Sequence, residues 1–490
     1  MEAELNVPTL ITFVLYLILM LMFGLFAYRV TNNLSDYILG GRKLGPGVTA
    51  LSAGASDMSG WLLLGLPGAV YAYGMNQVWI AVGLAAGAFL NWLFVARRLR
   101  RHTEIADDAI TLPDFLEHRF EDNTRILRVV SAVVILVFFT FYTSAGMVAG
   151  ATLFENTFGF GYLTALLVGA AVIIAYTFLG GFLAVSWTDF LQGILMFCAL
   201  LLVPAVGIAA MGGWGEVTAA VREVEPGGMS IWHDMTFLGI VSLLAWGLGY
   251  FGQPHILARF MAIRSEDQIP RAMGVGMTWM IFSLIGAVLT GLVAMAWFAD
   301  APLDDQEAAF IMLNQVLFNP WVAGILLAAI LAAIMSTIDS QLLVSSSALT
   351  ADFYKAMLRR DATEGELVWV GRAAVLGVAA IATLLAMDDE SLVLDLVAYA
   401  WAGFGAAFGP VIILSLFWRD MTRNGALAGL VVGAVTVIVW DMLGGGPAGI
   451  FDVYEILPGF IFATIAIVVF SRIGPEPSAA MRVQFERAHD

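Results

Sequence analysis

Apolar residues fill the chain in long runs separated by short polar connections. A run of 18 or more apolar residues is long enough to cross a bilayer as a helix. The pattern predicts about thirteen spans, over residues 7–28, 46–73, 77–96, 126–154, 161–179, 189–211, 236–254, 273–298, 319–350, 368–387, 391–418, 424–443 and 455–473. No polar stretch is long enough for a separate soluble domain, so we expect an all-α integral membrane protein with one domain over residues 1–490.

The second run, 46–73, is interrupted in its middle by small and polar residues, from Gly54 to Gly60. Asp57 is its one ionisable residue, with Ser59 two positions later. A lone carboxylate in hydrocarbon costs several kcal/mol and normally faces a bundle interior or a wet cavity. Backbone carbonyls freed at a helix break can bind a cation. We therefore predict a broken helix that binds a cation and a small solute; the alternative is that Asp57 caps a half-helix N-terminus.

A second interruption, Gly247 to Pro254, lies in the span 236–254. The ranges 46–211 and 236–418 each hold five spans, so the second set has inverted topology. Two broken spans in corresponding positions indicate a transport site between inverted repeats. Outside these repeats we expect an extra N-terminal span, 7–28, two C-terminal spans within 424–473, and a tail, 474–490.

Charged residues are scarce, 13% of a chain that is 60% hydrophobic, and their placement is asymmetric. With the N-terminus outside, all of the 23 Lys and Arg except Arg222 fall on the cytoplasmic side, including Arg259, Arg264 and Arg271. The positive-inside rule then predicts an outside N-terminus and a cytoplasmic tail. The net charge is −16 and the outer connections are acidic, which indicates either ordinary solvated loops or a surface that attracts cations.

The span 319–350 carries adjacent hydroxyls, Ser336 and Thr337, followed by Asp339. A hard cation such as Na⁺ needs several oxygen ligands, which hydroxyls and freed carbonyls supply. The alternative is that these hydroxyls bond back to their own helix. Asp339 can share a face with Ser336 and titrate, contact the cation, or mark the cytoplasmic end of a cavity.

Three further groups carry weaker signals. Thr188 and Asp189 either cap the helix that follows Gly181 or place a carboxylate near the inner exit. Trp246 and Tyr250 are spaced to form one wall of a pocket, and we expect His255 at an inner boundary. Thr111 is expected to cap a short amphipathic helix that lies under the bundle. The sequence has no hydrolase triad, phosphate loop or metal cluster, and its single cysteine, Cys198, forms no disulfide framework.

These stretches resemble the proline branch of the solute:sodium symporter family from about Thr9 to Met481. The resemblance rests on five segments: Asp36–Arg42, Leu51–Trp61, Gly180–Gln192, Trp246–His255 and Trp401–Pro410. It implies a bacterial inner-membrane protein, not an enzyme, that couples L-proline uptake to the sodium gradient by alternating access. Na⁺ is the implied coupling ion, and the resemblance implies no organic cofactor, nucleic acid or obligatory protein partner.

The resemblance also implies roles for individual residues. Sodium is expected on the carbonyls of Ala55, Met58 and Ala333 and on the hydroxyls of Ser336 and Thr337. Asp57 is expected to be needed for tight sodium coupling and Asp189 for sodium passage inward. Arg42 is expected in a functional inner loop, and proline near Ser59, Trp61, Tyr142, Trp246, Tyr250 and Pro254. Asp339–Ser340 is a departure from one relative in this family, which has two neutral residues there.

Three other functions fit parts of the pattern. The first is a transporter for another solute, such as a sugar, pantothenate or acetate. The second is a membrane sensor that binds solute and signals, although the tail after Arg472 is too short for an appended signalling domain. The third is a channel, which saturable uptake against a gradient would exclude.

Overall fold

The computed structural model describes residues 7–28, 34–177, 181–388, 391–444 and 447–489. Within these ranges the chain is helical and has no strand; a single bridge joins Leu44 to Ile263. The first half contains α1 (Val7–Tyr28), α2 (Leu34–Leu39), η1 (Gly40–Arg42), α3 (Pro46–Asp57), α4 (Gly60–Leu63), α5 (Gly65–Tyr73), η2 (Met75–Gln77), α6 (Val78–Leu90), η3 (Asn91–Ala96), α7 (Arg97–Ile105), α8 (Leu112–Arg119), α9 (Ile126–Phe158), α10 (Tyr162–Thr177), α11 (Phe182–Ala210) and α12 (Trp214–Val224).

The second half continues with α13 (Phe237–Ala245), η4 (Trp246–Phe251), α14 (Pro254–Ala262), η5 (Glu266–Gln268), α15 (Ile269–Trp297), η6 (Gln306–Ala308), α16 (Ala309–Leu317), α17 (Pro320–Ser347), η7 (Ala348–Leu358), α18 (Glu364–Leu385), α19 (Val393–Phe417), α20 (Arg423–Leu443), η8 (Pro447–Asp452), α21 (Ile456–Ile473) and α22 (Ala479–His489).

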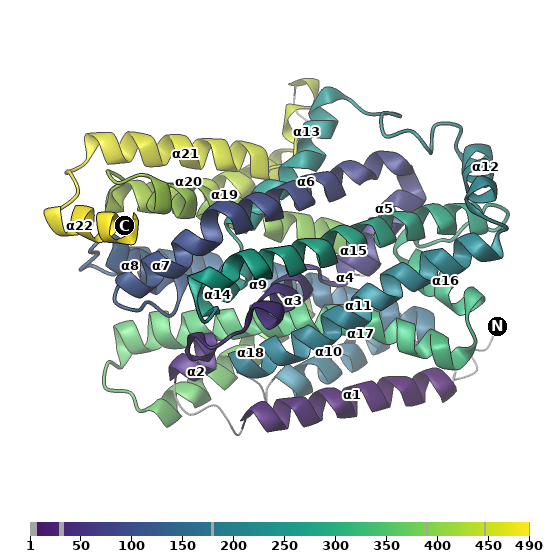
Figure 1. Ribbon diagram of the computed structural model, residues 1–490, viewed down its shortest axis with the longest axis horizontal. Coiled ribbons are helices and arrows are strands. Elements are labelled where there is room, and N and C mark those ends of the chain that lie inside the picture. The colour runs from purple at the N-terminus through teal and green to yellow at the C-terminus, as the bar shows by residue number, and fades with distance from the viewer. Residues whose placement is uncertain (1–6, 29–33, 178–180, 389–390, 445–446, 490) are drawn as a thin grey trace.

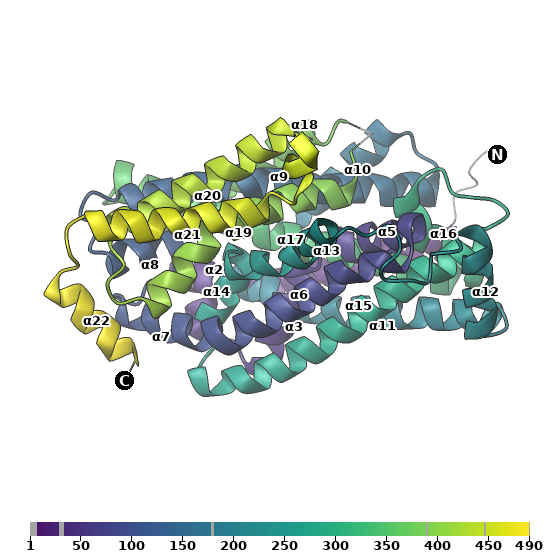
Figure 2. The same ribbon diagram turned by 90° about the horizontal axis from the view of Figure 1, so that it is seen from above.

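The long helices run side by side along the longest axis of the molecule (Figures 1 and 2). The two chain ends lie at opposite ends of this bundle, with α7, α8 and α22 near the C-terminus and α12 and α16 near the N-terminus. We call the end of the bundle that holds α7, α8 and α22 the C-terminal end. Helices α3 and α14, which flank the two breaks, have mostly buried side chains.

Every predicted span coincides with a helix or a broken series of helices. Among the described residues, nine helices are long and apolar enough to cross a membrane, or ten if the bent pair of 237–251 and 254–262 is one span. The remaining expected spans correspond to α1, α10 and the broken series α3 to α5. The protein is thus a multi-pass membrane protein, and the count of thirteen stays a prediction.

Small residues allow the second break to pack tightly against α6. A Cβ atom on Gly87 would lie 2.1 Å from the carbonyl oxygen of Gly247, and one on Gly83 would lie 2.5 Å from that of Leu244. Any larger residue would push the two segments apart. The glycines of α6 therefore set how closely this helix approaches η4.

The short helix expected under the bundle is α8. The Thr111 side chain accepts a hydrogen bond from the Asp114 amide (3.1 Å), as the capping pattern predicts. The apolar face, Leu112, Phe115, Leu116 and Phe120, is buried against the bundle. This prediction is confirmed.

Candidate functional site

The first break lies where the sequence predicts it. Helix α3 ends at Asp57, residues Met58 and Ser59 leave the helical conformation, and α4 starts at Gly60. The Ser59 hydroxyl accepts a hydrogen bond from the Trp61 amide (3.4 Å) and so caps α4. Asp57 ends one half-helix and does not cap the other, so the capping alternative is wrong.

The second break is also confirmed. Helix α13 ends at Ala245, a 3-10 segment covers Trp246 to Phe251, and α14 starts at Pro254. Proline suits this first helical position because a backbone N–H there would have no partner within the helix, so nothing is lost by its absence. The two half-helices are bent by 43°.

Asp57 joins the two breaks. Its Oδ2 atom accepts a short hydrogen bond from the Tyr250 hydroxyl of the second break. The backbone carbonyl of Asp57 accepts a hydrogen bond from the Tyr142 hydroxyl of α9 (3.3 Å). Asp57 is 2% exposed. Three elements far apart in the chain therefore converge on one residue.

The predicted sodium ligands lie together beside this junction. The carbonyl oxygen of Ala55 accepts hydrogen bonds from the hydroxyls of Ser336 (2.8 Å) and Thr337 (3.4 Å). Ser336 also donates to the Ala333 carbonyl (3.1 Å), and Met58 is buried at the break itself. Hydroxyl and carbonyl oxygens are the ligands that a hard monovalent cation prefers.

Aromatic side chains pack around the second break. Trp61 and Trp246 have ring centroids 6.2 Å apart and are buried. Trp401 of α19 donates from its indole N–H to the Trp246 carbonyl (2.7 Å), and its ring meets Tyr250 edge-on at 5.0 Å. Tyr454, just before α21, stacks on Trp246 at 5.4 Å.

Sequence reasoning missed two of these aromatic residues. Trp401 lies in one of the five stretches that carried the resemblance, and this is the signal that could have marked it. Tyr454 sits outside those stretches and outside the predicted repeats, so no pattern in the chain pointed to it.

Asp189 belongs to a buried polar network below the cation ligands. Its Oδ2 accepts hydrogen bonds from Ser52 (2.7 Å) and from Arg259 (3.1 Å). Arg259 also donates to Ser340 (2.5 Å) and to the carbonyl of His255 (2.9 Å). Both charged side chains of the pair are 0% exposed.

Three sequence expectations fail in this network. Helix α11 starts at Phe182, so Thr188 and Asp189 lie inside it and do not cap it. Arg259 was assigned to a connection, but it lies within α14. His255 was expected at a boundary, yet it is buried, with the Phe139 ring 5.6 Å and the Tyr142 ring 6.1 Å away.

Asp339 is buried on α17, one position before Ser340. It lies within electrostatic reach of Arg259. The residue that departs from one relative in the family therefore faces the same network as Asp189.

Arg42 lies at the C-terminal end of the bundle, away from the two breaks. It donates to the Asp108 carboxylate (2.7 Å), to the Met261 carbonyl (2.7 Å) and to the Ala109 carbonyl (2.9 Å). It therefore joins η1, the loop after α7 and the end of α14.

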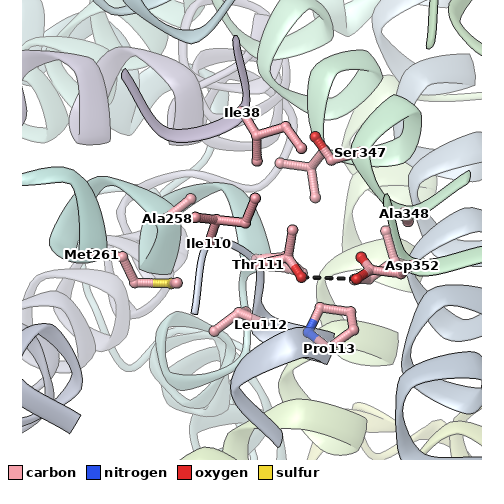
Figure 3. A pocket seen from close by; sticks show the side chains of 13 residues that line it. Ile38, Ile110, Thr111, Leu112, Pro113, Ala258, Met261, Ser347, Ala348 and Asp352 are labelled. Atoms are coloured by element: carbon pink, nitrogen blue, oxygen red, sulfur yellow. Dashed lines mark hydrogen bonds between the residues drawn. The ribbon is translucent and has the colours of Figure 1, made fainter. Parts of the chain in front are cut away.

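A small cavity extends from the second break toward this end. Pro254, Ala258 and Met261 of α14 line one side of it. On another side Thr111 donates to the Asp352 carboxylate (3.0 Å), as Figure 3 shows, and Arg128 donates to the same oxygen (2.8 Å). An ion pair, Arg128 with Asp352, thus borders the cavity.

The chain has close relatives among known proteins. The chain is 56% identical over 489 residues to the "Sodium/proline symporter" of Escherichia coli (strain K12), covering 99% of this chain and 96% of that one. It is 55% identical over 474 residues to the "High-affinity proline transporter PutP" of Bacillus subtilis (strain 168), covering 96% and 99%.

Among solved structures, a Na⁺-coupled sialic acid symporter in a substrate-bound outward-open state superposes with a TM-score of 0.80. It is 17% identical and covers 96% of this chain and 99% of that one. The likeness confirms the predicted fold class, an all-α integral membrane protein with an inverted-repeat core and broken helices. The sequence model of the "Sodium:solute symporter family" matches residues 37–433. The chain therefore belongs to the sodium:solute symporter family.

Proposed function

We propose that this protein carries L-proline into the cell together with sodium, driven by the sodium electrochemical gradient. The observation that carries the proposal is the meeting of both breaks at Asp57, beside the oxygen cluster of Ala55, Ser336 and Thr337. Two relatives named as proline transporters match nearly the full chain at 55–56% identity and support the choice of solute.

Sodium binds at the first break in this proposal. Its ligands are the carbonyls of Ala55, Met58 and Ala333 and the hydroxyls of Ser336 and Thr337. A cation here takes the place of the two hydrogen bonds that the hydroxyls donate to the Ala55 carbonyl. It then links α3 to α17 through shared oxygen ligands. Asp57 supplies a negative charge nearby without being a required direct ligand.

Proline lies between the two breaks. It is a compact zwitterion whose carboxylate suits the N-terminus of a half-helix such as α14. Its apolar ring suits aromatic walls. The residues assigned to it are Ser59, Trp61, Tyr142, Trp246, Tyr250 and Pro254.

Transport follows because sodium and proline stabilise the same conformation of the protein. Sodium and proline bind from outside, the outer side closes, the inner side opens, and both leave through the cavity that Pro254 lines. Asp189 assists sodium on the inward route. A membrane potential of 100 mV adds about 2.3 kcal/mol per charge, enough for roughly fiftyfold accumulation.

The protein resides in the bacterial inner membrane in this proposal, with the N-terminus outside and the C-terminus inside. The clustering of basic side chains at the C-terminal end supports this orientation, since cytoplasmic loops carry the excess of Lys and Arg. Arg42, Arg97, Arg128 and Arg419 all form ion pairs among the connections there.

Uptake of labelled proline into liposomes that contain the purified protein tests the proposal. We expect concentrative uptake with an inward sodium gradient and none without sodium. Unlabelled proline should compete, whereas a sugar, pantothenate and acetate should not. Equal uptake with and without sodium would contradict sodium coupling, and competition by another solute would replace proline.

A further inference from the structure

A second, small cavity lies on another side of Asp57. Helix α3, the start of η3, the second break and α15 enclose it. Most of its lining is apolar, with Trp92, Phe260 and Met280 among the side chains. None of the residues assigned above to sodium lies in this lining except Met58.

Two residues that line this cavity carry buried acceptor oxygens. Asp57 is 2% and Asn91 is 1% exposed, and both line it. Within the described part of the chain, neither Asp57 Oδ1 nor Asn91 Oδ1 has a hydrogen-bond partner. A buried oxygen without a partner costs free energy, and a carboxylate oxygen costs more than a neutral one.

The orientation of the Asn91 amide is fixed by its nitrogen. Asn91 Nδ2 donates to the Tyr250 carbonyl (2.9 Å), while the Tyr250 hydroxyl donates to the other carboxylate oxygen of Asp57, Oδ2. Tyr250 thus accepts from the amide nitrogen of Asn91 and donates to one carboxylate oxygen of Asp57. The oxygens left over are Oδ1 of Asp57 and Oδ1 of Asn91.

The backbone at Asn91 is unusual. A π-helical stretch, η3, starts at this residue and ends at Ala96. Such stretches carry an extra residue per turn and occur frequently at functional sites. Here the stretch starts at the one amide side chain that lines the cavity.

A carboxylate oxygen and an amide oxygen that share an apolar cavity attract a positively charged guest. A monovalent cation balances the single negative charge of Asp57, and a divalent cation would leave an excess charge in apolar surroundings. Hard cations prefer oxygen ligands. We propose that Asp57 and Asn91 form a second sodium site, distinct from the Ala55–Ser336–Thr337 cluster, in which one oxygen of each side chain binds the ion.

This inference rests on the proposed function, because it assumes that the coupling ion is sodium. It assigns Asn91 a role as a direct sodium ligand. It also makes Tyr250 responsive to sodium, since the residues that bind the ion hold its hydroxyl and its carbonyl. An ion in this cavity would therefore stabilise the second break.

Equilibrium binding of ²²Na⁺ to the purified protein without proline tests the site. Asn91→Ala removes the ligand oxygen and should weaken sodium binding about tenfold, as expected for loss of a group that supports an ion. Asn91→Asp keeps an oxygen at this position, so it should bind sodium more tightly than Asn91→Ala. Asn314→Ala is the matched control, because Asn314 of α16 likewise donates to a backbone carbonyl (Ala323, 3.2 Å).

Each outcome decides the inference. The inference is supported if sodium binding weakens in Asn91→Ala but not in Asn91→Asp or Asn314→Ala. Equal weakening in Asn91→Ala and Asn91→Asp would overturn it, because the bond to the Tyr250 carbonyl would then explain the effect. Unchanged binding in both variants would mean that the cavity holds only water. Wild-type proline uptake is measured separately, so a failure at Asn91 leaves sodium-coupled symport standing.

Discussion

Ser336 and Thr337 present two hydroxyls to one backbone carbonyl, that of Ala55. If these oxygens bind sodium, then Thr337→Ala removes one ligand and should raise the sodium concentration for half-maximal proline uptake by roughly tenfold. Thr436→Ala is a matched control, because Thr436 bonds back to its own helix at Val432 (2.7 Å) in α20. A sodium requirement that stays unchanged in Thr337→Ala would show that the assigned ligands are wrong.

Arg259 and Asp189 form an ion pair that is fully buried. Removing one partner of such a pair leaves an uncompensated charge and costs about 3–5 kcal/mol. We expect Arg259→Gln to lower the unfolding temperature of the purified protein strongly. The double variant Asp189→Asn with Arg259→Gln should recover most of the loss, since neither residue then carries a charge. If the double variant is as unstable as the single one, the charge of Asp189 is not the cause.

Residue chemistry predicted part of this site and missed the rest. Asp57 was predictable because it is the one charge in an apolar run, and Ser336 and Thr337 because adjacent hydroxyls fit a cation. Arg259 was not, because it stands shortly before Arg264 and Arg271 in sequence and resembles their interfacial charges. Its partner Asp189 is 70 positions away, and only the fold joins them.

Helix ends follow the sequence where a cap or a proline marks them. Helix α3 begins at Pro46 and α17 follows Asn319, whose side chain accepts from two amides. The start of α11 was placed too late, at residue 189, because Thr188 and Asp189 have the composition of a cap. Their polar groups instead bond inside the bundle, and Gly181 precedes the first turn without any side-chain cap.

The helix α8 carries a titratable group that predicts a pH effect. Hydrogen bonding to Asp114, with the nearby charge of Asp107, raises the pKa of His118 to about 9. A raised pKa means that the folded state binds the proton more tightly than the unfolded chain, whose histidine titrates near 6.5. The stabilisation is therefore fully present below pH 6.5 and is lost as the pH rises through about 9.

Thermal unfolding of wild type and His118→Gln, from about pH 6 to about pH 10, checks this effect. The wild type should lose more stability than the variant over this range. Parallel curves would show that the ion pairs of His118 contribute nothing to the stability of α8.

The whole molecule separates its charges between two ends. Basic side chains in the connections gather at the C-terminal end, and the chain ends lie at opposite ends of the bundle (Figure 1). The overall fold class was predictable because the length of the apolar runs and the Gly and Pro residues within them determine the spans and their breaks. The close approach of Gly87 to Gly247 was not, because it depends on how distant helices pack.

Thiol labelling of intact cells tests the orientation proposed from these charges. Cys198 is exposed and is first replaced by serine. Ser230→Cys, in the connection before α13, should react with an impermeant reagent in intact cells. Ala480→Cys, on α22, should react only after the membrane is permeabilised. The reverse pattern would invert the topology.

The central claim is that sodium and proline stabilise the same state through breaks that meet at Asp57. Linkage then requires each ligand to raise the affinity of the other by the same factor, which is roughly 5–150-fold in coupled proteins. The decisive measurement is the dissociation constant of proline with and without sodium, and that of sodium with and without proline, at constant ionic strength. The account predicts two equal factors well above one; a proline affinity that sodium does not change would contradict it.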